Sequence, residues 1–204
     1  SPASFGAAQE AYVTLATIPS NATEIGLILK ARNASGTRPA LVEVFYHPSQ
    51  GIVQGWCYEP GVGWRKLGGD IPVTFAAGDR FGVRMQNDGS LEVYRNSQLL
   101  GVRSATSWPY STSGGYIGLF MSNATGAKLD DFGGGTVNGS APPPTATPTA
   151  APSGSPTPTS TPTSTPVPGT PTATPVPGVY PSTGVLDTFN RANGAIGANW
   201  AGAT

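Results

Sequence analysis

The stretch VRMQNDGSLEVYRNSQLL, residues 83–100, indicates the fold class more directly than any other part of the sequence. Polar and apolar residues alternate on both sides of Asn87-Asp88-Gly89, whose residue types tolerate the positive backbone φ of a tight turn. A second turn at Arg95-Asn96-Ser97 leads into a further alternating run. The stretch therefore predicts two consecutive β-hairpins, which together form a meander.

The same period of two residues recurs between residues 9 and 132, and we find no sustained helical period of 3.6 residues there. The alternating runs are AYVTLAT, EIGLILKA, LVEVFYH, GIVQGWCY, DRFGVRMQ, SLEVYRN, YIGLFMS and AKLDDF. Many short strands separated by turn residues are typical of an antiparallel β-sandwich. We therefore expect an all-β fold.

Residues 139–184 differ sharply in composition from the rest of the chain. They hold 14 of the 21 prolines and no charged residue, and TPTSTPVPG at 161–169 is followed directly by TPTATPVPG. Proline cannot join a central β-ladder, so this segment should form a polyproline II spacer without a packed core. We expect a sandwich over residues 1–138, the Pro/Thr/Ser-rich spacer over 139–184, and a strand segment over 185–204.

Three stretches resemble one superfamily of β-sandwich modules. DTFNRANG at 187–194, followed by GANWAG, is similar to the first strand of laminin-G-like modules in the concanavalin A-like lectin/glucanase superfamily, as found in bacterial extracellular repeat proteins. DRFGVRMQNDGSLEVYRNSQLLGV at 79–102 and GGYIGLFMSNATGAKLDDFGGG at 114–135 are similar to the closing part of such modules. The resemblance implies a jelly-roll topology.

The opening and closing parts occur in inverted order, which leaves three interpretations: a circular permutant, a window of a tandem array, or a subunit whose last segment completes the next copy. In each case the sandwich lacks its first strand and has an open edge. We expect that edge to be filled by a donor strand, and copies of the chain to assemble head to tail into an extracellular fibre, stalk or matrix. The expected assembly-strand residues are Leu186, Asp187, Phe189, Ile196 and Trp200, and the expected acceptor edge is Lys128, Leu129, Asp130, Asp131 and Phe132.

The sequence gives no sign of catalysis, so we expect that the protein is not an enzyme. The alternating carboxylates of the related glucanases are absent. Asp130 and Asp131 are adjacent and should point to opposite faces of a strand, whereas Glu43 and Glu92 stand alone as solvent-facing positions. His47 has no second ligand at metal-binding spacing.

Carbohydrate binding is the alternative function, either as a lectin-like module or as the accessory domain of a secreted glycanase. Aromatic rings stack on the apolar faces of sugars, and Trp64, Trp108 and Tyr110 lie in glycine- and serine-rich segments that should be exposed. Trp56 is expected to be a core residue.

No cofactor is expected from the residues, with one exception that the resemblance implies. Related sandwiches often bind calcium where the first and last strands meet, through carboxylates and backbone carbonyls. Asp187 and Asp131, with Asp130 as the alternative, would be the carboxylates of such a site in this chain.

Charge and modification motifs favour an extracellular or cell-surface protein. Eleven basic and eleven acidic residues cancel, so nucleic acid and anionic membranes are not expected partners. No apolar run approaches the ~20 residues of a membrane span. Cys57 is a single cysteine without a disulfide partner. Asn-X-Ser/Thr glycosylation motifs occur at Asn21, Asn33, Asn123 and Asn138.

Overall fold

The computed structural model describes residues 4–32, 39–137, 180–191 and 200. These residues belong to one compact unit, while the second unit, Ser140–Val179, and with it most of the expected spacer, lies outside the described residues. The strands are β1 (Gln9–Thr17), β2 (Glu24–Ala31), β3 (Leu41–His47), β4 (Ile52–Glu59), β5 (Gly63–Lys66), β6 (Ile71–Pro72), β7 (Arg80–Met85), β8 (Ser90–Arg95), β9 (Gln98–Ser104), β10 (Tyr116–Ser122), β11 (Lys128–Thr136) and β12 (Val185–Asp187). Within the part described there is no helix that is long and apolar enough to cross a membrane.

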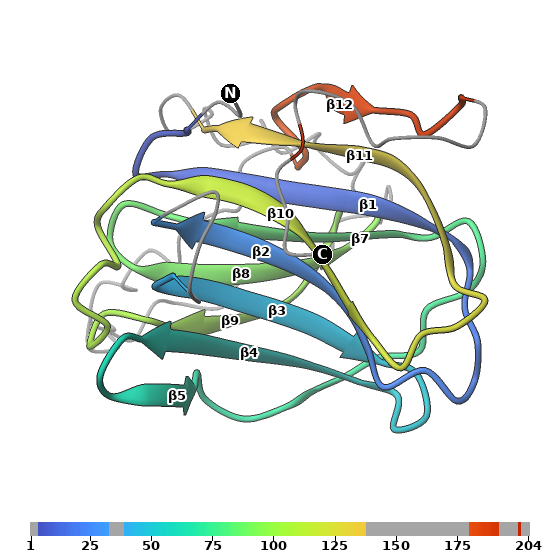
Figure 1. Ribbon diagram of the computed structural model, residues 1–204, viewed down its shortest axis with the longest axis horizontal. Helices are drawn as coiled ribbons and strands as arrows, with labels where there is room; N and C mark the ends of the chain where they lie inside the picture. Colours follow the sequence, from blue (N-terminus) through green and yellow to red (C-terminus); the bar gives the residue numbers. More distant parts are fainter. Residues whose placement is uncertain (1–3, 33–38, 138–179, 192–199, 201–204) are drawn as a thin grey trace, which may run out of the picture. The chain divides into compact units, whose positions relative to one another are not determined.

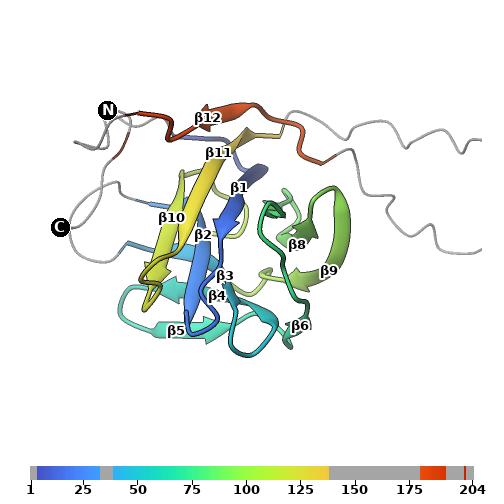
Figure 2. The ribbon, with the colours of Figure 1, turned by 90° about the vertical axis from the view of Figure 1, so that its right-hand side faces the viewer.

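The strands form two antiparallel sheets that pack face to face as a jelly-roll sandwich (Figures 1 and 2). Sheet I has the order β12-β11-β1-β7-β8-β9. Sheet II has the order β10-β2-β3-β4-β5, and β6 pairs with β4. The predicted all-β sandwich is confirmed.

Alternation along each strand decides which side chains enter the core between the sheets. On β1, Ala11, Val13 and Leu15 are completely buried in the core, while the residues between them face outward from sheet I. Leu27 and Leu29 of β2 pack into the same core from sheet II. The apolar pattern read from the sequence therefore fixes the faces of both sheets.

The meander predicted from residues 83–100 is present. Met85 pairs with Leu91 across the β7–β8 hairpin, and β8 pairs in turn with β9. Gly89 takes the positive φ, 82°, in the first turn, and Asn96 takes a φ of 57° in the second. Asp88 Oδ1 accepts a hydrogen bond from the Ser90 amide at 2.8 Å, which holds the first turn closed.

Strand β12 occupies the edge of sheet I that the sequence left open. It pairs antiparallel with β11, with Asp187 opposite Phe132 and Val185 opposite Gly133. The strand belongs to the same chain, whereas we expected it to enter another copy. The 42 residues between Val137 and Tyr180 can span roughly 130 Å when extended, so the chain is long enough to return to its own sheet.

The folded C-terminal segment begins earlier than expected. We assigned residues up to 184 to the spacer, but Tyr180 is already buried, at 2% exposure. We expected either Phe189 or Leu186 of this segment to face the core, and Leu186 is the exposed one, at 52%. Phe189 and Trp200 instead pack against the core, and the Trp200 ring centroid lies 5.2 Å from that of Phe132. Ile196 lies outside the described residues.

Candidate functional site

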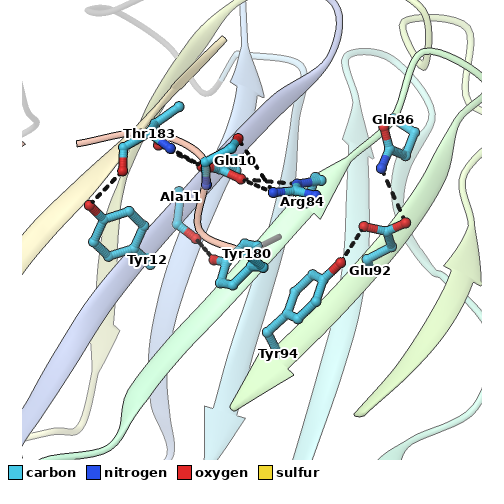
Figure 3. Close-up of polar contacts among 10 residues, drawn as sticks. Glu10, Ala11, Tyr12, Arg84, Gln86, Glu92, Tyr94, Tyr180 and Thr183 are labelled. Carbon is cyan, nitrogen blue, oxygen red and sulfur yellow. Dashed lines mark hydrogen bonds and ion pairs between the residues drawn. The ribbon is translucent and has the colours of Figure 1, made fainter. Parts of the chain in front are cut away.

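The segment Tyr180–Gly184, which we call the strap, lies across the outer face of sheet I (Figure 3). Its first residue provides the deepest contact. The Tyr180 ring stacks on Tyr94 of β8 with centroids 3.8 Å apart and planes inclined by 2°, and its hydroxyl donates to the Ala11 carbonyl at 2.9 Å. The strap therefore connects two strands that are not neighbours in the sheet.

Gly82 on β7 forms the seat for the Tyr180 ring. A Cβ atom at this position would overlap the Tyr180 hydroxyl and the adjoining ring carbons. Any other residue at position 82 would compete with the docked ring for the same space. This glycine therefore serves close approach between the sheet and the strap.

Glu10 on β1 lies under the strap and is fully buried. Arg84 of the adjacent β7 donates to Glu10 Oε2 from Nε at 2.9 Å and from Nη2 at 2.6 Å. The second oxygen, Oε1, accepts from the backbone N–H and the hydroxyl groups of both Ser182 and Thr183, at 2.6 to 3.1 Å. A buried charged pair is tolerated when hydrogen bonds replace the lost water, and the strap supplies four of them.

The polar network continues beyond the strap onto β8. The Tyr94 hydroxyl donates to Glu92 Oε2 at 2.6 Å, and Gln86 Nε2 donates to Glu92 Oε1 at 3.1 Å. Glu92, expected to be an isolated solvent-facing residue, is therefore part of a connected row of side chains (Figure 3). Burial, with Glu92 as its hydrogen-bond acceptor, raises the pKa of Tyr94 above its ordinary value.

Raising the pH above 10 should release the strap. The pKa of Tyr180 lies well above 10.0 because the ring is buried and because the Glu10 carboxylate is near. A released Tyr180 regains the ordinary pKa, so the docking free energy is complete below pH 10 and falls above it by about 1.4 kcal/mol per pH unit. Phenolate formation can be followed by ultraviolet absorbance in the parent chain and in Tyr180→Phe. The difference between the two titration curves reports the ionisation of Tyr180. A difference curve centred on the ordinary pKa would contradict the docked geometry.

None of the residues at the centre of this site, Glu10, Arg84 and Tyr180, was predicted from the sequence. Glu10 and Arg84 occupy outward positions of alternating strands, where charged residues are ordinarily solvated. Tyr180 lies in the segment assigned to the spacer. The sequence did contain one indication of a contact in this segment: Tyr180 is the only aromatic residue between 139 and 184.

The predicted sugar-binding residues do not lie together in one exposed loop. Trp108 is fully buried in the core, where its Nε1 donates to the Tyr58 carbonyl at 3.1 Å. This corrects its assignment as a sugar-binding residue: the ring fills the space between the sheets. Tyr110 is half-buried, with its ring edge-on to Trp108 and the Arg32 guanidinium 5.6 Å from its centroid. Trp64 alone is exposed, at 41%.

Trp64 instead belongs to an aromatic face formed by Trp56, Tyr58 and Trp64 on the outside of sheet II. Tyr58 of β4 pairs with Trp64 of β5, and the two ring centroids are 5.2 Å apart. Trp56, expected in the core, is half-buried on this same face. Gln54 accepts from Trp56 Nε1 at 3.1 Å, and the Lys66 ammonium lies 5.9 Å from the Trp56 centroid. Rings and polar groups therefore alternate along one sheet edge.

Of the carboxylates expected to hold calcium, Asp187 is engaged by groups of the chain itself. Asp187 accepts hydrogen bonds from Arg191 Nη1 at 2.6 Å, from Trp200 Nε1 at 2.7 Å and from the Phe189 amide at 2.8 Å. The Arg191 hydrogen bond, opposed in part by burial, lowers the pKa of Asp187 to about 2. Asp131 lies in a bulge of β11 with a φ of 47°. Among the described residues, no three Asp, Glu, His or Cys side chains gather for a metal ion.

The expected acceptor edge contacts two different strands. On one side β11 pairs with β1, with Lys128, Leu129 and Asp130 among the paired residues, and on its other side it receives β12 at Phe132 and Gly133. The glycosylation motifs at Asn21 and Asn123 are exposed. Asn33 and Asn138 lie outside the described residues.

No protein-family model matches this sequence, and no protein of curated function is detectably similar to it. The solved structures with similar sandwiches include the following three. The carbohydrate-binding module CBM66 from Bacillus subtilis is 14% identical, with 65% of this chain and 76% of that chain covered and a TM-score of 0.45. The CBM40 module of Ruminococcus gnavus IT-sialidase bound to α2,3-sialyllactose is 10% identical (62% and 68% covered, TM-score 0.39). The SAP-like pentraxin of Limulus polyphemus is 12% identical (64% and 65%, TM-score 0.39). Likeness at this level assigns no site and no ligand to the chain.

Proposed function

We propose that the chain is a non-catalytic carbohydrate-binding module of an extracellular protein, and that it binds through the aromatic face of sheet II. The observation that carries this proposal is the exposed Trp64 ring, set beside Tyr58 and Trp56 on paired strands. The proposal assigns no catalytic role to any residue.

The chemistry of the aromatic face suits a sugar polymer. The C–H groups on one side of a pyranose ring pack against aromatic rings, while its hydroxyl groups need polar partners at the rim. Gln54 and Lys66 provide an amide and an ammonium group on the same face as the rings. Val62, 78% exposed in the turn between β4 and β5, extends the apolar surface. A row of this kind favours binding of an extended polysaccharide over binding of a single sugar in a deep pocket.

Replacing Trp64 with alanine should weaken polysaccharide binding by roughly tenfold or more. A tenfold change in affinity corresponds to about 1.4 kcal/mol of binding free energy, which is close to the contribution of one well-stacked ring. Affinity electrophoresis in gels containing xylan, mannan or a mixed-linkage β-glucan, with pull-down on cellulose, measures the effect. Val102→Ala is the matched control, since Val102 is 47% exposed but lies on sheet I. Unchanged binding in Trp64→Ala, or no binding by the parent chain to any of these polymers, would refute the proposal.

The exposed motifs at Asn21 and Asn123 support an extracellular location. The Asn21 and Asn123 turns are adjacent, because the Thr23 hydroxyl of the first motif donates to the Ser122 carbonyl at 2.9 Å. Attached glycans at these two positions would therefore lie at one end of the sandwich, away from steric conflict with the core.

Head-to-tail assembly is the second candidate function, and the strap is the observation that favours it. The contacts of the strap and of β12 join residues 180–187 to strands that lie more than forty positions earlier in the sequence, and the same contacts could form with the sandwich of another copy. The intervening segment raises the effective concentration of the chain's own strap, so assembly requires that two copies be close together.

Mixing two variants with complementary defects tests this candidate. Gly82→Ala should retain a strap but lose the seat for Tyr180, whereas Tyr180→Ala should retain the seat but lose the ring. If straps pass between copies, the mixture should form a one-to-one complex by light scattering after size-exclusion chromatography, while each variant alone stays monomeric. A mixture that remains monomeric at the highest attainable concentration would rule out strap exchange.

A further inference from the structure

The outer face of sheet I beneath the strap has the composition of a recognition site. An aromatic ring, Tyr94, lies beside a hollow at Gly82, and the Glu10–Arg84 pair adjoins both. Glu10 and Arg84 are buried by the strap, although they occupy outward positions of their strands. The face beneath the strap therefore offers a carboxylate, a guanidinium and an aromatic ring within one small area.

The strap fills this face with a particular set of groups. A flat ring stacks on Tyr94 at 3.8 Å. Two adjacent hydroxyl groups, those of Ser182 and Thr183, donate to one oxygen of Glu10 at 3.1 and 2.7 Å. A ring face against an aromatic side chain, with neighbouring hydroxyls on a carboxylate that is itself held by arginine, is the pattern of contacts that a pyranose sugar can make.

We propose that the face beneath the strap is a second ligand site, specific for a pyranoside with two adjacent free hydroxyl groups, and that the strap closes this site when no ligand is bound. The Tyr180 ring occupies the position on Tyr94 where the sugar ring would stack. The Ser182 and Thr183 hydroxyls occupy the positions from which the sugar hydroxyls would donate to Glu10. This site is distinct from the aromatic face of sheet II, so it stands or fails independently of the proposed function.

Closure by the strap determines how the site responds to ligand. Ligand and strap compete for Glu10 and Tyr94, so the measured affinity equals the intrinsic affinity multiplied by the fraction of molecules with the strap released. A strap released in about one molecule in a hundred weakens apparent binding roughly a hundredfold. Removal of the Tyr180 ring should therefore increase affinity for the sugar.

The test uses the full chain in a Trp64→Ala background, which removes the exposed ring of the aromatic face. Methyl β-D-galactopyranoside and methyl α-D-mannopyranoside are the probes, and cyclohexanol, a ring without a diol, is the control compound. Saturation-transfer NMR and calorimetry should show that Tyr180→Ala binds at least one pyranoside ten or more times tighter than the chain with Tyr180 intact. Cyclohexanol should show no such gain.

Further variants separate ligand binding from loss of structure. Adding Tyr94→Ala to the opened chain should abolish the gain, and Ser182→Ala with Thr183→Ala, which removes both hydroxyls but keeps the Tyr180 ring, should produce a smaller gain. Circular dichroism establishes that each variant is folded. If no folded, opened variant gains affinity for either pyranoside, or if the gain survives Tyr94→Ala, the proposal is wrong.

Discussion

Replacing Glu10 with glutamine should lower the free energy of unfolding by about 3 to 5 kcal/mol. The substitution preserves the shape of the side chain but removes the counter-ion of Arg84, whose side chain is 3% exposed. Water cannot reach the guanidinium while the strap is docked, so the variant must either keep an unpaired charge buried or release the strap. Release of the strap would limit the loss to the free energy of strap docking, whereas a strap that stays docked leaves the full loss, a large part of the about 5 to 15 kcal/mol that stabilises a domain. Urea denaturation followed by tryptophan fluorescence gives the difference.

Two comparisons isolate the buried pair as the cause. Lys66→Gln breaks the ion pair with Asp70, whose side chains are 32% and 40% exposed, and should cost less than about 1 kcal/mol. Glu10→Leu combined with Arg84→Met removes both charges and should recover much of the loss, because no buried charge is left unpaired. A Glu10→Gln chain as stable as Lys66→Gln would show that Arg84 does not depend on Glu10.

Replacing Gly82 with alanine should expel the strap while the sandwich stays folded. The new Cβ would overlap the Tyr180 hydroxyl and the adjoining ring carbons, so the docked ring could not keep its position. The amides of Ser182 and Thr183 would then lose Glu10 as their acceptor. Hydrogen exchange at these two amides, followed by mass spectrometry, should accelerate at least about tenfold, whereas amides of the core strands stay protected.

Gly118→Ala is the matched control for this experiment. Gly118 also lies in a strand, β10 of sheet II, and a Cβ there would meet only Ile28, at an ordinary 3.9 Å. It should leave exchange in the strap unchanged. Slow exchange at Ser182 and Thr183 in Gly82→Ala would mean that the strap docks without the Tyr180 ring in its seat.

Local sequence patterns were sufficient to predict the strands and the all-β sandwich. The hairpin at residues 83–100 depends on alternation and on turn residues that are close together in the chain, so it can be read directly. Trp108 shows the limit of such reading. The segment after β9 looks like an exposed loop by composition, yet it places the indole between the sheets, because a large ring is stabilised by burial in a gap that only the folded sandwich creates.

The strap site could not be read from the sequence for a different reason. Glu10 and Arg84 are 74 positions apart, and Glu10 and Ser182 are 172 apart. No local period or spacing connects residues at such separations, since only the strand order of sheet I brings them together. Composition added to the difficulty, because the prolines before Tyr180 are characteristic of a spacer while Tyr180 itself forms a buried contact.

The seat at Gly82 also has an evolutionary consequence. A side chain at position 82 and an aromatic ring at position 180 exclude each other, so the two positions are coupled across 98 residues of sequence. A descendant that loses the ring is released from the requirement for glycine, and one that gains a side chain at 82 is released from the requirement for the ring. Selection should therefore exclude one combination only, a side chain at position 82 together with a docked aromatic ring at position 180.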